Sequence, residues 1–231
     1  MTIEEFLAVV RGRLIVSCQA GAGHPLRESA TIARLARAAV AGGAAAVRGG
    51  GVGGVADVIA IREAVPVPLI GLTKDGGDGV FITPTVQATQ AVIAAGADVI
   101  AVDGTRRPRP DGRTLADSVT AAHEAGALVM ADIADLNDGI AAAAAGADVI
   151  ATTLAGCLSA PVPGGPDVAL VTALRAAALG RPIVAEGRYH RPEQVAAALA
   201  AGADAVVVGT AITDPVWITR SFTDAIEGAP A

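Results

Sequence analysis

Polar and charged residues follow eight apolar segments of the chain, at the point where each segment ends. Lys74 follows VPLIGLT and Glu186 follows PIVA. An amine that is partly removed from water has a lowered pKa and can act as a base, and a nearby carboxyl group can be its acid or base partner. Strand ends are also polar simply because they reach solvent, but the regularity of the set favours a site. The ends are Cys18-Gln19, Arg48, Thr73-Lys74, Asp103, Asp132, Thr152-Thr153, Glu186-Gly187-Arg188 and Gly209-Thr210.

Three of these ends carry a carboxylate. Asp103, Asp132 and Glu186 are candidates for acid–base groups or for ligands of a substrate hydroxyl. For Asp132 there is a second interpretation, because the following IADLNDG contains a predicted helix start that an aspartate could cap.

The residues after the seventh and eighth apolar segments are suited to bind an anion. Gly187 follows the seventh segment, and Gly209 with Thr210 follows the eighth. In barrels that bind phosphate, the loops after strands 7 and 8 and a helix N-terminus hold the phosphate through backbone N–H groups. Glycine permits that close approach. The alternative is that these glycines only serve turns.

The elements that must position these residues come from a repeated unit. Each copy is an alanine-rich helix end, a glycine, a β-branched run and a polar or glycine residue, which indicates a helix with a glycine C-cap and a strand buried on both faces. Eight strands with intervening helical patterns predict an α/β fold, a (β/α)8 barrel. A doubly wound open sheet is the alternative. The clearest copies are 39–50, 94–104, 144–154 and 200–210.

No composition break divides the chain, so we expect a single barrel domain over residues 1–231, with a short leading helix at 2–11. Thr2 and Glu5 match a capping box for that helix. Asp214 and Pro215 are suited to open the last helix.

Composition argues against several classes of function. The net charge is −6 and only 2% of the 231 residues are aromatic, so neither a basic field nor stacking platforms favour nucleic acid. The sequence contains no apolar run of about 18 residues, so no membrane span is predicted. The two cysteines and three histidines show no ligand spacing, so we expect no metal site. A reducing, cytoplasmic location without a signal peptide is expected.

Two further motifs have a structural and a functional interpretation. The glycines of 49–55 satisfy G-x-G-x-x-G, the dinucleotide fingerprint, but they follow the second strand and a cluster of five glycines matches by chance, so we expect a flexible loop. RRPRPDGR (106–113) is expected to be an extended loop that is either solvated or holds an anionic substrate or a neighbouring subunit.

Taken in order, the motifs resemble the N-acetylmannosamine-6-phosphate 2-epimerase family from about residue 13 to residue 220. No single motif is specific, but their combination is. They are LIVSCQ (14–19), VR (47–48), GLTK (71–74), VFITPT (80–85), VDGTRRPRP (102–110), MADI (130–133), ATTLAG (151–156), IVAEGRYH (183–190) and VVGTAIT (207–213).

The resemblance implies a barrel of the ribulose-phosphate-binding type that epimerises a phosphorylated amino sugar at C2 without a cofactor, and a homodimer is compatible with it. It implies Lys74 as the base and Glu186 as its partner carboxylate, with Asp132 assisting. The remaining assignments are Gln19, Arg48, Asp103 and Thr153 for the sugar, and Gly187, Arg188, Gly209 and Thr210 for the phosphate.

The chain departs from the family in three loops, at 49–55, 75–79 and 156–165, which puts the acetamido pocket and the exact sugar in question. Other sugar-phosphate barrel enzymes, such as a pentose-phosphate 3-epimerase or a thiamine-phosphate synthase, are alternatives. The pentose-phosphate epimerases usually have histidine metal ligands on early strands, where this chain has Gln19 and Arg48. A non-catalytic sugar-phosphate-binding barrel is the alternative outside the enzymes.

Overall fold

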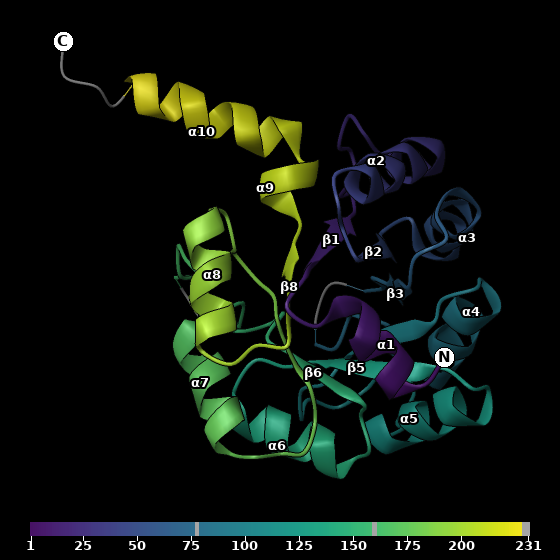
Figure 1. Ribbon diagram of the computed structural model, residues 1–231. Coiled ribbons are helices and arrows are strands. Elements are labelled where there is room, and N and C mark those ends of the chain that lie inside the picture. Colours follow the sequence, from purple (N-terminus) through teal and green to yellow (C-terminus); the bar gives the residue numbers. More distant parts are fainter. Residues whose placement is uncertain (77–78, 159–160, 228–231) are drawn as a thin grey trace.

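Eight parallel strands close into a barrel in chain order, as the sequence predicts (Figure 1). The computed structural model describes residues 1–76, 79–158 and 161–227. Closure leaves each strand paired on both sides, from β1–β2 round to β8–β1. The strands are β1 (Leu14–Cys18), β2 (Ala46–Gly51), β3 (Leu69–Thr73), β4 (Val99–Asp103), β5 (Leu128–Asp132), β6 (Val149–Ala151), β7 (Ile183–Ala185) and β8 (Ala205–Val208).

Helices follow the strands and form the outer layer (Figure 1). The glycine of the repeated unit stands after α2, α4, α6 and α8 with φ of +99°, +94°, +95° and +101° at Gly43, Gly96, Gly146 and Gly202. Only glycine adopts this region without a steric penalty, which explains the repeat. The helices are α1 (Ile3–Val10), α2 (Ser29–Ala41), α3 (Gly54–Ala64), α4 (Val86–Ala94), α5 (Leu115–Glu124), α6 (Leu136–Ala144), α7 (Val168–Ala176), α8 (Pro192–Ala200), α9 (Thr210–Thr213) and α10 (Pro215–Glu227).

Side chains of each strand alternate between the barrel interior and the helix layer. Ile70 and Leu72 of β3 belong to the interior cluster, whereas Leu69 packs with the residues that face the helices. The same alternation puts Met130 inside the barrel and Val129 outside it. Because the period is two, Lys74 and the other strand-end candidates that continue the inward series are directed to the barrel mouth.

The second strand differs from the expectation. Arg48 does not end β2; it lies inside the strand, level with Ser17 and Ile70, and Gly49 to Gly51 continue the ladder. The expected flexible loop is therefore wrong for these three glycines, and Gly54 already begins α3. The physical reason is space: a Cβ on Gly50 would lie 1.9 Å from the carbonyl oxygen of Leu72. The glycines let β2 and its neighbours approach closely.

Gly50→Ala is expected to lower the free energy of unfolding by about 3 kcal/mol, because it adds a backbone clash to a φ of +115°. Urea unfolding measures the effect. Gly126→Ala is the matched control: its φ is +74°, but nothing lies within 4 Å of the added Cβ, so only about 1 kcal/mol is expected. Equal losses in the two variants would contradict the packing explanation.

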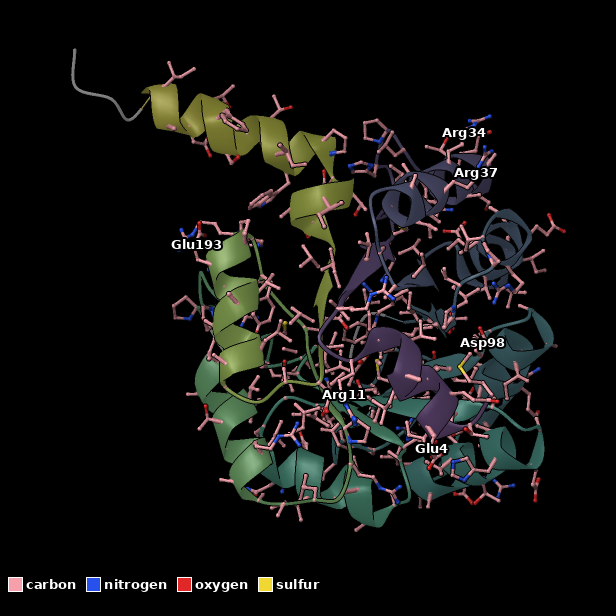
Figure 2. The ribbon with its side chains drawn as sticks, in the orientation of Figure 1. Glu4, Arg11, Arg34, Arg37, Asp98 and Glu193 are labelled. Atoms are coloured by element: carbon pink, nitrogen blue, oxygen red, sulfur yellow. The ribbon has the colours of Figure 1, made fainter. Side chains whose placement is uncertain are left out.

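The predicted ends of the chain have the expected caps. Thr2 and Glu5 form the capping box of α1, and Asp214 caps α10 by accepting a hydrogen bond from the Trp217 N–H at 2.9 Å. Trp217 in the first turn of α10 packs on His190, with the ring centroids 4.4 Å apart. From there α10 extends away from the barrel body, and its side chains from Thr219 to Ile226 are exposed (Figures 1 and 2). In the part of the chain that the structure describes, no helix combines the length and hydropathy needed to cross a bilayer.

Candidate active site

A cavity of about 360 Å³ lies at the carboxyl ends of the strands, where barrels of this kind bind their ligands. Ser17, Val52, Tyr189, His190, Thr213 and Asp214 contribute to its wall. Arg48, Asp103 and Asp132 do not line it, and the remaining candidates do. Those candidates are Gln19, Lys74, Thr153, Glu186, Gly187, Arg188, Gly209 and Thr210.

An ion-pair network joins three strands close to this cavity. The Arg48 guanidinium donates to both carboxylate oxygens of Asp132, with Nη1 at 2.9 Å and Nη2 at 2.5 Å. Arg48 Nη1 also lies 2.8 Å from Glu186 Oε2. Arg48 and Asp132 are buried, at 1% and 0% exposure, whereas the Glu186 side chain keeps 11%. The arginine therefore holds the cavity-lining carboxyl group from below.

The Thr153 hydroxyl completes the network. Its Oγ1 is 2.6 Å from Asp132 and 3.0 Å from Glu186. A hydroxyl can donate to one acceptor at a time, so it can follow the charge between the two carboxylates. The strand-end residues of β5, β6 and β7 are thus coupled through one hydroxyl and one guanidinium.

Lys74 faces the same carboxylates and is the only lysine in the chain. The Lys74 side chain is exposed and lines the cavity, while protein atoms crowd around its amine. This burial lowers the pKa of the Lys74 amine, and the nearby Arg48 cation lowers it further, while Glu186 and Asp132 oppose the shift. The amine is therefore easier to obtain in its neutral, basic form than that of a surface lysine.

Glu186 is shifted in the opposite sense. Burial raises the pKa of its carboxyl group, and the adjacent Asp132 raises it too, against the lowering effects of Arg48, Thr153 and Lys74. Burial would lower the pKa of Arg48, but the two carboxylates more than compensate and keep it cationic. A base of lowered pKa beside an acid of raised pKa is an arrangement suited to proton transfer.

Comparison with known proteins identifies the family. Residues 32–228 match the family described as "Putative N-acetylmannosamine-6-phosphate epimerase". The chain belongs to this family. The Cutibacterium acnes protein named "Putative N-acetylmannosamine-6-phosphate 2-epimerase" is 48% identical over 226 residues, 96% of this chain and 97% of that protein. A protein of the same name from Corynebacterium glutamicum (strain R) is 46% identical and covers 93% of both chains.

Solved structures agree with this epimerase family. The N-acetylmannosamine-6-phosphate 2-epimerase from Clostridium perfringens has a TM-score of 0.90 and 40% identity, and the match covers 95% of each chain. A 3-hexulose-6-phosphate synthase from Salmonella typhimurium, at 23% identity, has a TM-score of 0.64 and covers 93% of this chain and 98% of that one. At that identity the likeness concerns the fold alone.

In this member of the epimerase family, β1 supplies two polar groups to the cavity. The Gln19 amide donates from Nε2 to Ser17 Oγ at 2.9 Å, and among the described residues its buried Oε1 has no partner. Gln19 therefore has a buried acceptor that no described protein group satisfies. Sequence reasoning missed Ser17, although its spacing of two residues from Gln19 is the inward period of the strand.

The wall formed by β7 and β8 offers backbone donors. Among the described residues, the N–H groups of Gly187, Gly209 and Thr210 donate to no protein acceptor. Gly187 has a φ of +105°, and a Cβ there would lie 3.3 Å from the Thr153 carbonyl oxygen. α9 begins at Thr210, as the sequence predicts. Free N–H groups on a cavity wall favour an anionic oxygen.

Arg188 and Asp103 are placed differently from the other candidates. The Arg188 Nε donates to the Gly165 carbonyl at 2.8 Å, and its Nη1 lies 3.6 Å from Cys157 Sγ, so the loop after β6 holds a side chain expected at the phosphate. The Asp103 carboxylate is fully buried and accepts from Thr105 and, at 2.7 Å, from Arg107. The structure therefore does not bring Asp103 to the cavity, because its own loop satisfies it.

Arginines of the loop at 106–113 are likewise bonded to groups of the protein itself. Arg106 pairs with Asp138 at 2.8 Å, and Arg109, which is buried, donates to the Asp103 carbonyl. These contacts tie the loop after β4 to the start of α6. Within the described ranges 1–76, 79–158 and 161–227, no group of three or more His, Cys, Asp or Glu side chains is placed to hold a metal ion.

Proposed function

We propose that this protein interconverts N-acetylmannosamine 6-phosphate and N-acetylglucosamine 6-phosphate. Membership of the epimerase family supports the substrate class. The observation that carries the proposal is Lys74, a base of lowered pKa, facing Glu186, an acid of raised pKa, across a cavity whose far wall has free backbone N–H groups.

In the proposed reaction the sugar binds in its open-chain form, because the C2 proton is acidic only next to the C1 carbonyl. The neutral Lys74 amine takes this proton, and the electron pair of the C2–H bond moves toward the C1 oxygen. Glu186 donates a proton to that oxygen as it becomes negative. The enediol unit then turns so that its opposite face meets Lys74, the ammonium returns the proton to C2, and the C1 hydroxyl returns its proton to Glu186, which gives the epimer and restores both groups. Oxidation states are the same at the start and the end.

The other network residues support this chemistry without lining the cavity. Both Asp132 oxygens are engaged by Arg48, so Asp132 fixes the guanidinium rather than shuttling protons. Arg48 in turn fixes Glu186 and lowers the lysine pKa. We assign the phosphate to the wall of Gly187, Gly209 and Thr210, and a sugar hydroxyl to Gln19.

Incubation of the protein with N-acetylmannosamine 6-phosphate in deuterated water tests the proposal. Deuterium at C2 of both sugars, followed by NMR, is the expected result, and unphosphorylated N-acetylmannosamine is the control. Binding without exchange would favour the sugar-phosphate-binding barrel. Turnover of ribulose 5-phosphate in place of the amino sugar would favour another sugar-phosphate isomerase.

The pH dependence follows from the roles of Lys74 and Glu186. Because the amine must be neutral to accept a proton and the Glu186 carboxyl group must keep its proton to donate it, kcat/KM should have a bell-shaped pH dependence, with both limbs below the pKa of an ordinary lysine. Glu186→Gln removes the acid, so the residual activity of this variant should rise with pH to a plateau without a falling limb. A pH–rate profile of both proteins measures this, and a falling limb that persists in Glu186→Gln would contradict it.

We also propose a homodimer, in which α10 packs on a second copy. In a (β/α)8 barrel the helix after β8 packs between the helices that follow β7 and β1, here α8 and α2. α10 instead stands off the barrel (Figure 1). It carries an apolar stripe at a spacing of four residues, Ile218, Phe222 and Ile226, of which Phe222 is 68% and Ile226 is 75% exposed.

The barrel offers a matching apolar groove of about 330 Å³ beside α8 and α9. Its lining includes Leu14, Pro192, Val195, Val208 and Ile212. α10 of the same chain leads away from this groove, so a second copy is the occupant that we propose.

Light scattering after gel filtration should show a dimer that the double variant Phe222→Glu/Ile226→Glu converts to monomer. Thr223→Glu, on another face of α10, should leave the dimer unchanged. A monomeric wild-type protein would contradict the proposal.

We place the enzyme in the cytoplasm. Both cysteines are free thiols, one buried and one exposed. Free thiols are typical of reducing compartments.

A further inference from the structure

The loop after β3 returns and inserts between two strands of the barrel. β3 and β4 pair through Ile70–Val99 and Gly71–Ile100. Beyond these pairs, the segment 80–83 takes up the ladder: the Ile82 carbonyl accepts from the Asp103 N–H at 2.9 Å, and the Thr83 N–H donates to the Thr73 carbonyl at 3.0 Å. The segment therefore fills the seam directly beside Lys74.

Thr83 makes a second hydrogen bond to the same residue. Its Oγ1 accepts from the Thr73 N–H at 3.1 Å, so a side chain replaces the missing strand partner. Thr83 is fully buried, and its φ is +40°. Positive φ is a genuine outlier for a β-branched residue and persists only where the surroundings fix it. Such strain is often found where a functional group must be held.

The main chain on the other side of Lys74 is held as well. The Lys74 N–H donates to the Gly51 carbonyl at 2.9 Å, and Lys74 forms an antiparallel bridge with Ile82. The Thr73 hydroxyl donates to Asp75 Oδ2 at 2.5 Å. A lysine side chain has four rotatable bonds, so the position of its amine depends on how firmly its Cα is fixed.

From this arrangement we infer that Thr83 is a positioning residue for Lys74: its hydroxyl closes the end of β3 and directs the Lys74 amine at Glu186. The inference rests on the proposed role of Lys74 as the base. Thr83 does not line the cavity, so its effect is on the geometry of the base and not on a substrate contact.

Thr83→Ser and Thr83→Ala test the inference as a pair, because both lose the methyl group and only alanine loses the acceptor. We expect kcat of Thr83→Ala to fall by about 10²-fold with KM little changed, since a displacement of about 1 Å can have this cost. The serine variant should restore most of kcat. The matched control is Thr89 of α4, which is also fully buried but donates from its hydroxyl to the carbonyl of Thr85, the N-cap residue of that helix. Thr89→Ala should leave kcat unchanged.

The amine can also be observed without turnover. Reductive methylation with ¹³C-formaldehyde labels Lys74, the only lysine, and the chain's amino terminus. In Thr83→Ala the pKa of the Lys74 amine should move up toward its ordinary value as the amine leaves the protein atoms that crowd it, and in Thr83→Ser it should not. Should the alanine variant fail to fold, Thr83→Val removes the acceptor at nearly constant volume and takes its place.

An unchanged kcat together with an unchanged amine titration in Thr83→Ala or Thr83→Val would overturn the inference, as would a loss of kcat that serine does not restore. The two proposals fail separately. If Lys74→Ala keeps its turnover, the proposed base is wrong, yet the effect of Thr83 on the amine titration is still measured.

Discussion

Replacing Lys74 with alanine is expected to slow deuterium exchange at C2 by about 10²–10⁴-fold, the usual contribution of a general base. Lys74 lines the cavity and lies beside Glu186, Arg48 and Asp132, and the chain contains no other lysine that could substitute. The phosphate wall of Gly187 and Gly209 is untouched by the change. Calorimetry should therefore still detect binding of the sugar phosphate.

Lys74→Arg separates the base from its positive charge. A guanidinium keeps its proton at any ordinary pH, so this variant preserves the cation but not the basic form. We expect it to be as inactive in exchange as Lys74→Ala, with an unchanged thermal midpoint. Exchange at the wild-type rate in Lys74→Arg would mean that Lys74 acts only through its charge and that another group removes the proton.

Arg48→Met is expected to have the largest effect on stability, a loss of about 3–5 kcal/mol in the free energy of unfolding. The arginine is 1% exposed and pairs with two carboxylates, and its removal leaves Asp132 and Glu186 without the cation that they contact. Urea unfolding measures the loss. Arg11→Met, which breaks the pair with Asp204 from a side chain that is 64% exposed, is the matched control and should change stability by less than about 1 kcal/mol.

The loss should depend on pH in a defined direction. Without Arg48, the folded-state pKa of Glu186, already raised by burial, rises further above its unfolded value. A carboxyl group with a raised folded pKa destabilises the protein when ionised, and the penalty disappears as pH falls through that pKa. The difference between wild type and Arg48→Met should therefore narrow in acid. A difference that widens in acid would show that the pair is not what stabilises the site.

The alternation of side chains explains why much of the site could be predicted from the sequence. Lys74, Asp132 and Glu186 each stand where an apolar run ends, and a parallel barrel gathers all such ends at one mouth. The closed barrel was also predicted, because the unit of helix, glycine and strand repeats along the sequence. These features are local in the sequence and therefore visible in it.

What could not be predicted depends on contacts between distant segments. The glycines after Arg48 have low strand propensity, so the sequence did not predict that β2 continues through them. Glycine is needed there because Leu72 and Ile61 leave no room for a side chain. Asp103 stands at a strand end like the other carboxylates, but Arg107 and Thr105 in the next loop bind its carboxylate and keep it away from the cavity. Thr83 has no signature in the sequence, because threonine does not predict a positive φ.

The direct pairing of β3 with β4 covers only two positions, and beyond them the segment 80–83 bridges the seam. β2 and β3 pair from Val47–Leu69 to Gly51–Thr73, and β4 and β5 from Val99–Leu128 to Asp103–Asp132, whereas β7 is joined to each neighbour at two positions. The ring thus consists of two well-paired arcs with β7 between them. Lys74 ends one arc, Asp132 belongs to the other, and Glu186 follows β7. Slow amide exchange should reveal the arcs as separate cooperative units, and opening one seam would dismantle the proton-transfer pair while both arcs stay folded.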